Sequence, residues 1–419
     1  MADRFWVQGT GSWSDDDNHW SDSSGGSPSD GFLPGTGDRV FFDVNSFSSS
    51  GQIVTIDVAA TCEYMDWTGA ANTPTLAGSQ SLTFSSPLSF LSIVFISAMT
   101  VTFTGAISIE GNGNGTFIDT QGKVLSGGLS YTSGSAVGET VRLDSNLNLG
   151  SGDLIVSATG VNNYSLDLNG KTLTCGSFNL NSETASSFYC YAATINCSNV
   201  VFSDYFDIYL GSSTWNLSAT SGSSWSISNT FSNITLDAGT STINVNGSSI
   251  FDGGGLTYKT VVLSGTIVEV QSSNTFSTLT ISAGITVKFT SGTTQTVTTF
   301  NAIGTLGNLI TIQSTTDNSA HILSKASGTV NTDYISIKDS TATGGATWIA
   351  GGTSYDMGGN TGWVFNATTT STSTTSTSSS TSSSTTSSTS TTTTSTSVAF
   401  LKFSIDTGEV LQLDVRIVK

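Results

Sequence analysis

Short segments in which apolar and polar residues alternate fill the middle of the chain. From about residue 60 to residue 365, stretches such as TINV at 242–245 and TVKF at 286–289 place apolar residues two positions apart. This is the period of a β-strand with one buried face. Gly, Asn, Ser and Asp separate the segments at intervals of about 8–12 residues, a spacing typical of all-β folds. The pattern therefore predicts an all-β protein.

Two further features favour a parallel β-helix, or β-solenoid, over residues 61–366. The segments repeat one another, since FSNITLDAG at 231–239 is matched by FSTLTISAG at 276–284, and such self-similarity is typical of stacked coils. No proline follows Pro87, as expected where nearly every strand is hydrogen-bonded on both sides. Because the repeat period is irregular, a chain of tandem β-sandwich modules is the second hypothesis.

Residues 1–60 differ from the repeats that follow. They carry Trp6, Trp13 and Trp20 at intervals of seven, an acidic run at 15–17 and two of the four prolines. A solenoid exposes an open core and an unpaired edge at each end, and bulky side chains can cover both. We interpret this region as an N-terminal cap. The alternative is that the three tryptophans stack on a sugar ligand.

The end of the chain has two parts of different composition. Residues 368–397 are Ser and Thr only, so we expect a disordered linker over 367–397. Residues 398–419 return to a strand pattern and predict a two-stranded hairpin. The residues expected to form its docking surface are Phe400, Phe403, Ile405, Leu411, Leu413, Val415 and Ile417. Because an isolated hairpin is marginal in water, we expect it to dock on another protein, join identical copies or fold back on its own domain.

Charge and hydropathy exclude some classes of partner. The net charge is -18, and an acidic surface repels phosphate backbones and anionic headgroups, so neither nucleic acid nor a membrane surface is expected to bind. The longest apolar run, residues 90–103, is too short to span a bilayer. The N-terminus shows no signal-peptide pattern. Release by lysis as part of a virion is the expected route, with an extracellular or cell-surface location as the alternative.

The residues suited to metal or cofactor binding are few. The four cysteines, Cys62, Cys175, Cys190 and Cys197, form no CxxC pair, and we expect buried thiols. The acidic run at 15–17 lacks the twelve-residue calcium loop and is interpreted as a solvated turn. We expect no cofactor and no metal site.

Catalytic signals are equally sparse. NTD at 331–333 matches one short motif of polygalacturonases, but the companion carboxylates, Gly-His-Gly and Arg-x-Lys are missing. Candidate acid pairs are Asp204 with Asp207 and Asp333 with Asp339, and hydrolysis needs two facing carboxylates. We expect no enzyme activity, and a β-helical capsule depolymerase is the alternative.

Residues 276–365 carry the most specific resemblance. NTFSTLTISAGITVKFTSGTT, then DYISIKDSTATGGATW and GGNTGWVF, resemble a module that ends many tailed-phage and prophage surface proteins. The Trp-rich start is similar to segments ahead of β-helical repeats in such proteins. The resemblance implies a fibre, spike or decoration component of a virion, forming a homo-oligomer and contacting other virion proteins through 398–419 or host glycans. A bacterial adhesin is a further alternative. In this interpretation Asp333 and Asp339 are turn formers.

Overall fold

The computed structural model describes residues 2–85, 91–111, 116–133, 138–158, 163–203, 205–228 and 233–365. The predicted linker, the seven apolar hairpin residues from Phe400 to Ile417 and Asp204 lie outside the described residues. The domain bounds proposed for 367–419 therefore stay predictions.

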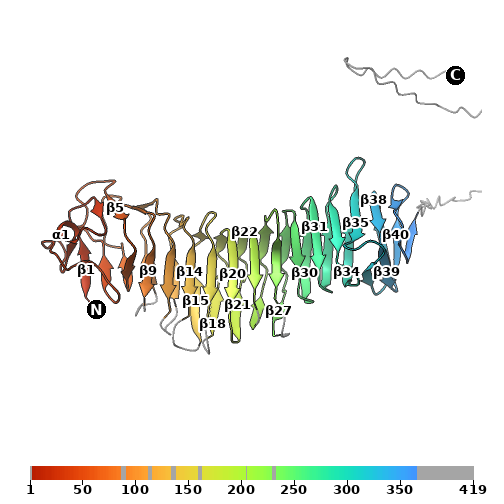
Figure 1. Ribbon diagram of the computed structural model, residues 1–419, viewed down its shortest axis with the longest axis horizontal. Helices are drawn as coiled ribbons and strands as arrows, with labels where there is room; N and C mark the ends of the chain where they lie inside the picture. The colour runs from red at the N-terminus through yellow and green to blue at the C-terminus, as the bar shows by residue number, and fades with distance from the viewer. Residues whose placement is uncertain are drawn as a thin grey trace, which may run out of the picture. The chain divides into compact units, whose positions relative to one another are not determined.

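The described part of the chain is a parallel β-solenoid of about 13 turns. Its strands follow one another side by side from the N-terminal to the C-terminal end (Figure 1). Among the named strands, only β1 and β3 pair antiparallel. The prediction of a β-solenoid is confirmed, and the alternative of tandem β-sandwich modules is wrong, because coil n pairs with coil n+1 in parallel rather than folding into antiparallel sheets.

Three long sheets form the walls of the solenoid. Sheet 1 contains, in spatial order, β3 (Trp20–Ser21), β1 (Asp3–Trp6), β4 (Arg39–Phe41), β7 (Tyr64–Asp66), β10 (Leu91–Val94), β13 (Thr116–Asp119), β15 (Glu139–Leu143), β18 (Tyr164–Asp167), β21 (Ser186–Tyr189), β24 (Phe206–Tyr209) and β27 (Thr235–Asp237). Sheet 2 contains β6 (Ala60–Cys62), β9 (Leu82–Ser85), β12 (Ile107–Glu110), β14 (Leu129–Thr132), β17 (Leu154–Ser157), β20 (Ser177–Asn181), β23 (Asn199–Phe202), β26 (Ser223–Ile227), β29 (Ser249–Asp252), β31 (Ile267–Gln271), β33 (Thr286–Phe289), β35 (Ile310–Ser314), β38 (Ile335–Lys338) and β41 (Tyr355–Asp356). Sheet 3 contains β16 (Leu147–Asn148), β19 (Thr172–Thr174), β22 (Thr194–Cys197), β25 (Thr214–Leu217), β28 (Thr242–Val245), β30 (Thr257–Leu263), β32 (Thr275–Ile281), β34 (Thr294–Ala302), β36 (His321–Lys325) and β39 (Ser340–Gly344).

Two short sheets complete the ends. Sheet 4, near the N-terminus, contains β2 (Gly11–Ser12), β5 (Ile53–Ile56), β8 (Thr75–Gly78) and β11 (Thr100–Val101). Sheet 5, near residue 365, contains β37 (Thr329–Thr332), β40 (Thr347–Ala350) and β42 (Trp363–Phe365). The single described helix is the one-turn α1 (Asp16–His19). No helix in the described ranges has the length and apolar content needed to cross a membrane.

The alternation seen in the sequence decides which side chains enter the core. In β22, Ile195 and Cys197 are buried while Thr194 and Asn196 face outward, as the strand period of two requires. The same register continues from coil to coil, since Ile195 pairs with Trp215 on β25. Stacked apolar residues therefore form one continuous core along the solenoid.

Asx turns form the corners between sheet 1 and sheet 3. In three coils an aspartate ends or follows the sheet 1 strand, and its carboxylate accepts the N–H of the residue two positions on. That residue has a positive φ, a conformation that Asn, Asp and Gly tolerate best. The three pairs are Asp119 with Gln121, Asp167 with Asn169 and Asp237 with Gly239. These corners account for part of the acidic surplus of the chain.

The C-terminal coils agree with the sequence interpretation. Asp333 accepts hydrogen bonds from the N–H of Tyr334 and from Thr353, and Asp339 accepts the N–H of Asn318. Both aspartates therefore act as turn formers, as predicted. The last coils are filled by Ile335, Ile337 and Trp348, all buried.

Candidate ligand-binding face

An unbroken column of side chains runs along the outer face of sheet 1. The register pairs one residue from each of six successive strands. In order, the column is Phe117, Arg142, Asp167, Tyr189, Tyr209 and Asp237. Neighbouring strands lie about 4.8 Å apart, so consecutive side chains of the column are neighbours on this face. The column begins with the Arg142 guanidinium 4.3 Å from the centre of the Phe117 ring.

Two tyrosines of this column, Tyr189 and Tyr209, and the neighbouring corner residue Tyr191 form a stack that we call the tyrosine ladder. The rings of Tyr189 and Tyr209 are parallel within 4° with centroids 4.8 Å apart. The ring of Tyr191 lies 6.3 Å from that of Tyr189. Tyr191 is 56% exposed and Tyr209 39% exposed. Part of the aromatic surface of the ladder is therefore accessible to solvent.

The tyrosine ladder interrupts the corner pattern of the solenoid. Tyr189 and Tyr209 occupy the register positions that Asp167 and Asp237 hold in the flanking coils, and a phenol cannot accept the Asx hydrogen bond. Tyr191 occupies the left-handed corner position, with φ of 54°, where its neighbouring coil has Asn169. A bulky residue is disfavoured there. Residues that do not favour this corner therefore occupy three positions, and two of them, Tyr191 and Tyr209, are exposed. Local departures of this kind are expected at functional surfaces.

Carboxylates and hydroxyls flank the ladder. Asp207 lies next to it on the same face, paired in register with Ser187 and Thr235, and the Thr235 hydroxyl donates to Asp207 at 2.5 Å. The charge of Asp207 is the main cause that raises the pKa of Tyr209 above its ordinary value. The phenol therefore stays a neutral donor and acceptor, beside acceptors suited to ligand hydroxyls.

A groove opens where the column ends. Sheet 1 stops at β27, and β30 of sheet 3 continues the coil with a longer strand. The groove between them has a volume of about 430 Å³, and Asp237, Leu236, Lys259 and Ser277 line it. It extends the face of the ladder with one carboxylate and one ammonium group.

The three tryptophans near the N-terminus are buried, which corrects the alternative of a sugar-stacking platform. Trp6, Trp13 and Trp20 are at most 1% exposed, so no ring face is free for a ligand. They pack on one another edge to face, and Trp20 donates its indole N–H to the carbonyl of Trp13 at 2.7 Å. Their packing fills the first coils of the solenoid.

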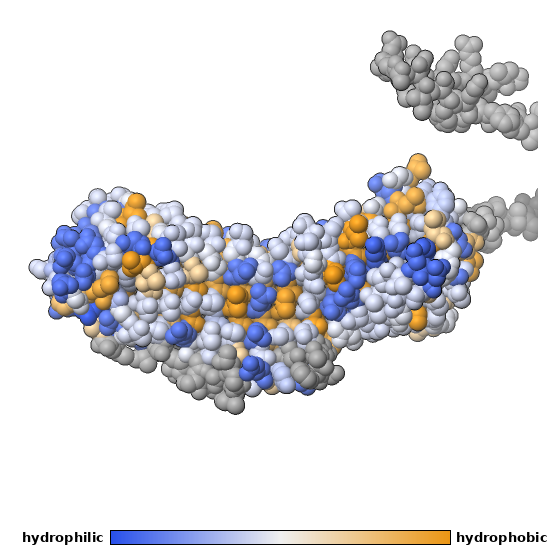
Figure 2. All heavy atoms as spheres, in the orientation of Figure 1, coloured by the Kyte–Doolittle hydropathy of each residue, from blue (hydrophilic) through white to orange (hydrophobic). Residues whose placement is uncertain are grey.

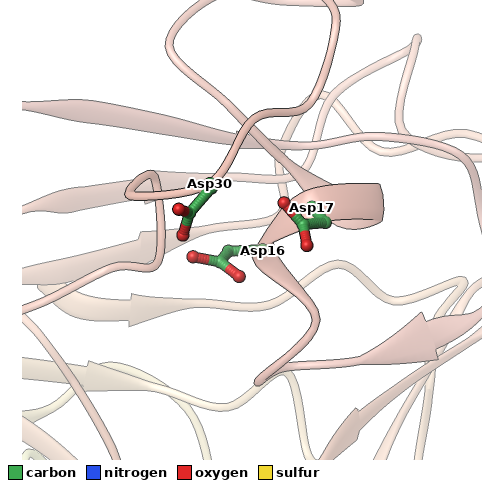
Figure 3. Close-up of side chains that lie close together, drawn as sticks. All are labelled: Asp16, Asp17 and Asp30. Carbon is green, nitrogen blue, oxygen red and sulfur yellow. The ribbon is translucent and has the colours of Figure 1, made fainter.

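Three acidic side chains gather near α1. Oxygen atoms of Asp16, Asp17 and Asp30 lie within 4.8 Å of one another, and Figure 3 shows the carboxylates of Asp16 and Asp30 directed toward each other. Asp16 accepts the backbone N–H of Gly31 at 3.0 Å, which ties the helix to the following loop. The cluster includes two of the three residues of the acidic run at 15–17. The interpretation of that run as a solvated turn stays a prediction.

The candidate catalytic acids occupy different surroundings. Asp207 lies beside the tyrosine ladder, while Asp333 and Asp339 are engaged in the turns described above. Hydrogen bonds from Thr353 and Tyr334 outweigh burial and lower the pKa of Asp333, so this carboxylate is held in its charged form. A general acid requires the opposite shift.

The comparisons with known proteins leave the fold as the only established feature. No family model, no curated protein and no solved structure matches the chain. The β-solenoid part of the expected resemblance is confirmed by the structure, whereas no relative identifies a phage origin. The candidate site is therefore assigned on its own residues.

The sequence contained a signal for the tyrosine ladder that periodicity alone did not reveal. SSFYCY at 186–191 and FDIYLG at 206–211 carry tyrosine where YSLDLN at 164–169 carries Asp and Asn. Alignment of the segments by their corners, rather than by their strands, shows these substitutions. They become meaningful once the register places them on one face.

Proposed function

We propose that this chain is a non-catalytic binding protein whose solenoid presents the tyrosine ladder to a sugar ligand. The observation that carries the proposal is the replacement of turn-forming residues by three stacked tyrosines, of which Tyr191 and Tyr209 are exposed. An aromatic ring binds the apolar C–H face of a pyranose, and its phenol can bond a sugar hydroxyl. Aromatic residues of this kind supply much of the energy of binding surfaces.

The charges around the ladder favour one class of sugar. Asp167, Asp207 and Asp237 surround it, and the chain carries a net charge of -18. Acidic polysaccharides are therefore repelled. A neutral or basic glycan fits, because the carboxylates accept hydrogen bonds from hydroxyl or ammonium groups.

The placement of the protein on a virion is a second part of the proposal. Residues 276–365 and the Trp-rich start resemble tailed-phage surface proteins, which favours a fibre, spike or decoration component. The hairpin pattern at 398–419, carried on a Ser/Thr linker, suits anchoring to another virion protein or joining identical copies. A bacterial adhesin would use the same ladder on a cell surface, and a capsule depolymerase would add catalytic acids beside it.

Alanine substitution of the ladder tests the binding proposal. We expect the full-length protein to bind neutral or basic sugars on a glycan array, and the Tyr189→Ala/Tyr209→Ala variant to lose at least about tenfold in affinity, or about 1.4 kcal/mol. Titration calorimetry with the best array sugar measures the loss. Tyr355→Ala is the control, since Tyr355 is an exposed tyrosine, 56% exposed, that lies on β41 rather than in the ladder.

Two results would contradict the proposal. One is that no sugar binds the full-length protein. The other is that the ladder variant and Tyr355→Ala bind the sugar with the same affinity as the unchanged protein. Release of reducing ends from a polysaccharide would favour the depolymerase instead.

A further inference from the structure

Two of the four cysteines lie on adjacent coils in register. Cys175 follows β19 and Cys197 ends β22, and these strands pair Leu173 with Ile195 and Thr174 with Asn196. The N–H of Cys175 donates to the carbonyl of Asn196 at 3.0 Å. The register therefore makes Cys175 and Cys197 the next pair, and both thiols are free and buried.

Both cysteines line an open groove at the corner between sheet 3 and sheet 2. The groove has a volume of about 530 Å³, and its other lining residues include Thr174, Asn196 and Asn216. Cys175 is 5% exposed and Cys197 4% exposed. The thiols thus lie in the wall of a space that a small molecule can enter.

The other two cysteines are neither paired in register with another cysteine nor part of the groove. Cys62, in β6, and Cys190 are each 0% exposed. They serve as internal controls.

We infer that Cys175 and Cys197 form an intramolecular disulfide when the protein meets a small-molecule disulfide such as glutathione disulfide. In-register residues on neighbouring strands have Cα atoms about 4.8 Å apart, inside the range of about 4.4–6.8 Å that a disulfide bridges. The bond would join one coil to the next, across 22 positions of sequence. This inference is independent of the sugar proposal.

The reaction is two thiol–disulfide exchanges. One cysteine thiolate attacks a sulfur of glutathione disulfide, which forms a mixed disulfide and releases one glutathione thiolate. The second cysteine thiolate then attacks the cysteine sulfur of the mixed disulfide and releases the second glutathione. Two protein thiols are oxidised to one disulfide, the glutathione disulfide is reduced to two thiols, and the two protons pass from the cysteines to the glutathione.

The buried position of the pair sets the rate of this reaction. The hydrogen bond with Cys175, together with burial, raises the pKa of Cys197 well above its ordinary value. Little thiolate is present at neutral pH, so exchange should be slow there and faster at alkaline pH. A pair of this kind stays reduced inside a cell and oxidises over longer times outside it.

Thiol alkylation after oxidation tests the inference. The full-length protein is reduced, freed of reductant, exposed to glutathione disulfide at pH 7 and pH 9, denatured and alkylated with N-ethylmaleimide. We expect two alkylated cysteines instead of four and one cross-linked peptide containing residues 175 and 197. Without alkylation, the intact mass of the oxidised protein should be lower than that of the reduced protein by two hydrogens. We also expect the oxidised protein to unfold at a temperature a few degrees higher, because the bond restricts the unfolded chain.

Single variants identify the pair. Cys175→Ser and Cys197→Ser should each abolish the bond, whereas Cys190→Ser should leave it intact. Circular dichroism checks that each variant folds. Four alkylated cysteines in the oxidised native protein, a bond involving Cys62 or Cys190, or a disulfide-linked dimer would each overturn the inference.

Discussion

At the scale of single residues, His321 is a buried titratable group whose charged form the core disfavours. It is fully buried in β36, with its ring 4.9 Å from that of Phe289. Burial lowers its pKa to about 4, and the backbone and charge of Asp339 oppose this shift only in part. The imidazole is therefore neutral in the folded protein at pH 5, while in the unfolded chain it is protonated below about pH 6.5.

This difference predicts acid sensitivity. The unfolded chain binds the proton at a higher pH than the folded protein. We therefore expect His321 to lower the free energy of unfolding by about 3 kcal/mol as the pH falls from about 6.5 to about 4. His321→Leu should remove that part of the pH dependence. Denaturant unfolding of both proteins at several pH values measures the free energy of unfolding. The two proteins share the same carboxylates, so the difference between their curves reports the contribution of His321. Parallel curves over this range would contradict the prediction.

At the scale of the structural element, the corner is the unit that varies. Within a strand, the alternation of apolar and polar residues decides which side chains are buried. At the corners the residues differ: Asp167 and Asn169 form a hydrogen-bonded turn, whereas Tyr189 and Tyr191 at the next corner form a less favourable one. The two corners are successive turns of the same solenoid. The comparison of these two corners shows which residues the fold favours and which residues serve the proposed ligand-binding surface.

Replacing Tyr191 with asparagine, the residue at the corresponding corner position of the preceding coil, should therefore increase stability and weaken sugar binding. Tyr191→Asn replaces a bulky side chain at φ of 54° with one that tolerates this conformation, and we expect a gain of about 1 kcal/mol in the free energy of unfolding. Affinity for the sugar should fall in the same variant. Thermal unfolding and calorimetry measure the two effects. A variant that is less stable than the unchanged protein would show that the tyrosine is there for packing.

At the scale of the whole molecule, each coil contacts mainly its neighbours. Figure 2 shows a visible face on which polar residues predominate and hydrophobic residues form separate patches. Solenoids of this type gain stability from stacking between adjacent coils.

Truncation after Asn366 tests the role of residues 367–419. We expect the truncated protein to keep its unfolding temperature and its sugar affinity but to lose attachment to particles or oligomer formation. Analytical ultracentrifugation and particle sedimentation measure these properties. If attachment and oligomeric state both survive the deletion, the hairpin is not the anchor.

The sequence by itself determined the strands, their buried faces and the turn-forming aspartates, because a period of two assigns each side chain to one face of its own strand. The β-solenoid followed from the similarity of its segments. Only the tertiary structure decided that Tyr189 and Tyr209, 20 positions apart, stack at 4.8 Å, that Cys175 lies in register with Cys197, and that the three N-terminal tryptophans are buried. These contacts depend on how coils of unequal length align, and alternation within a strand carries no information about the register between strands.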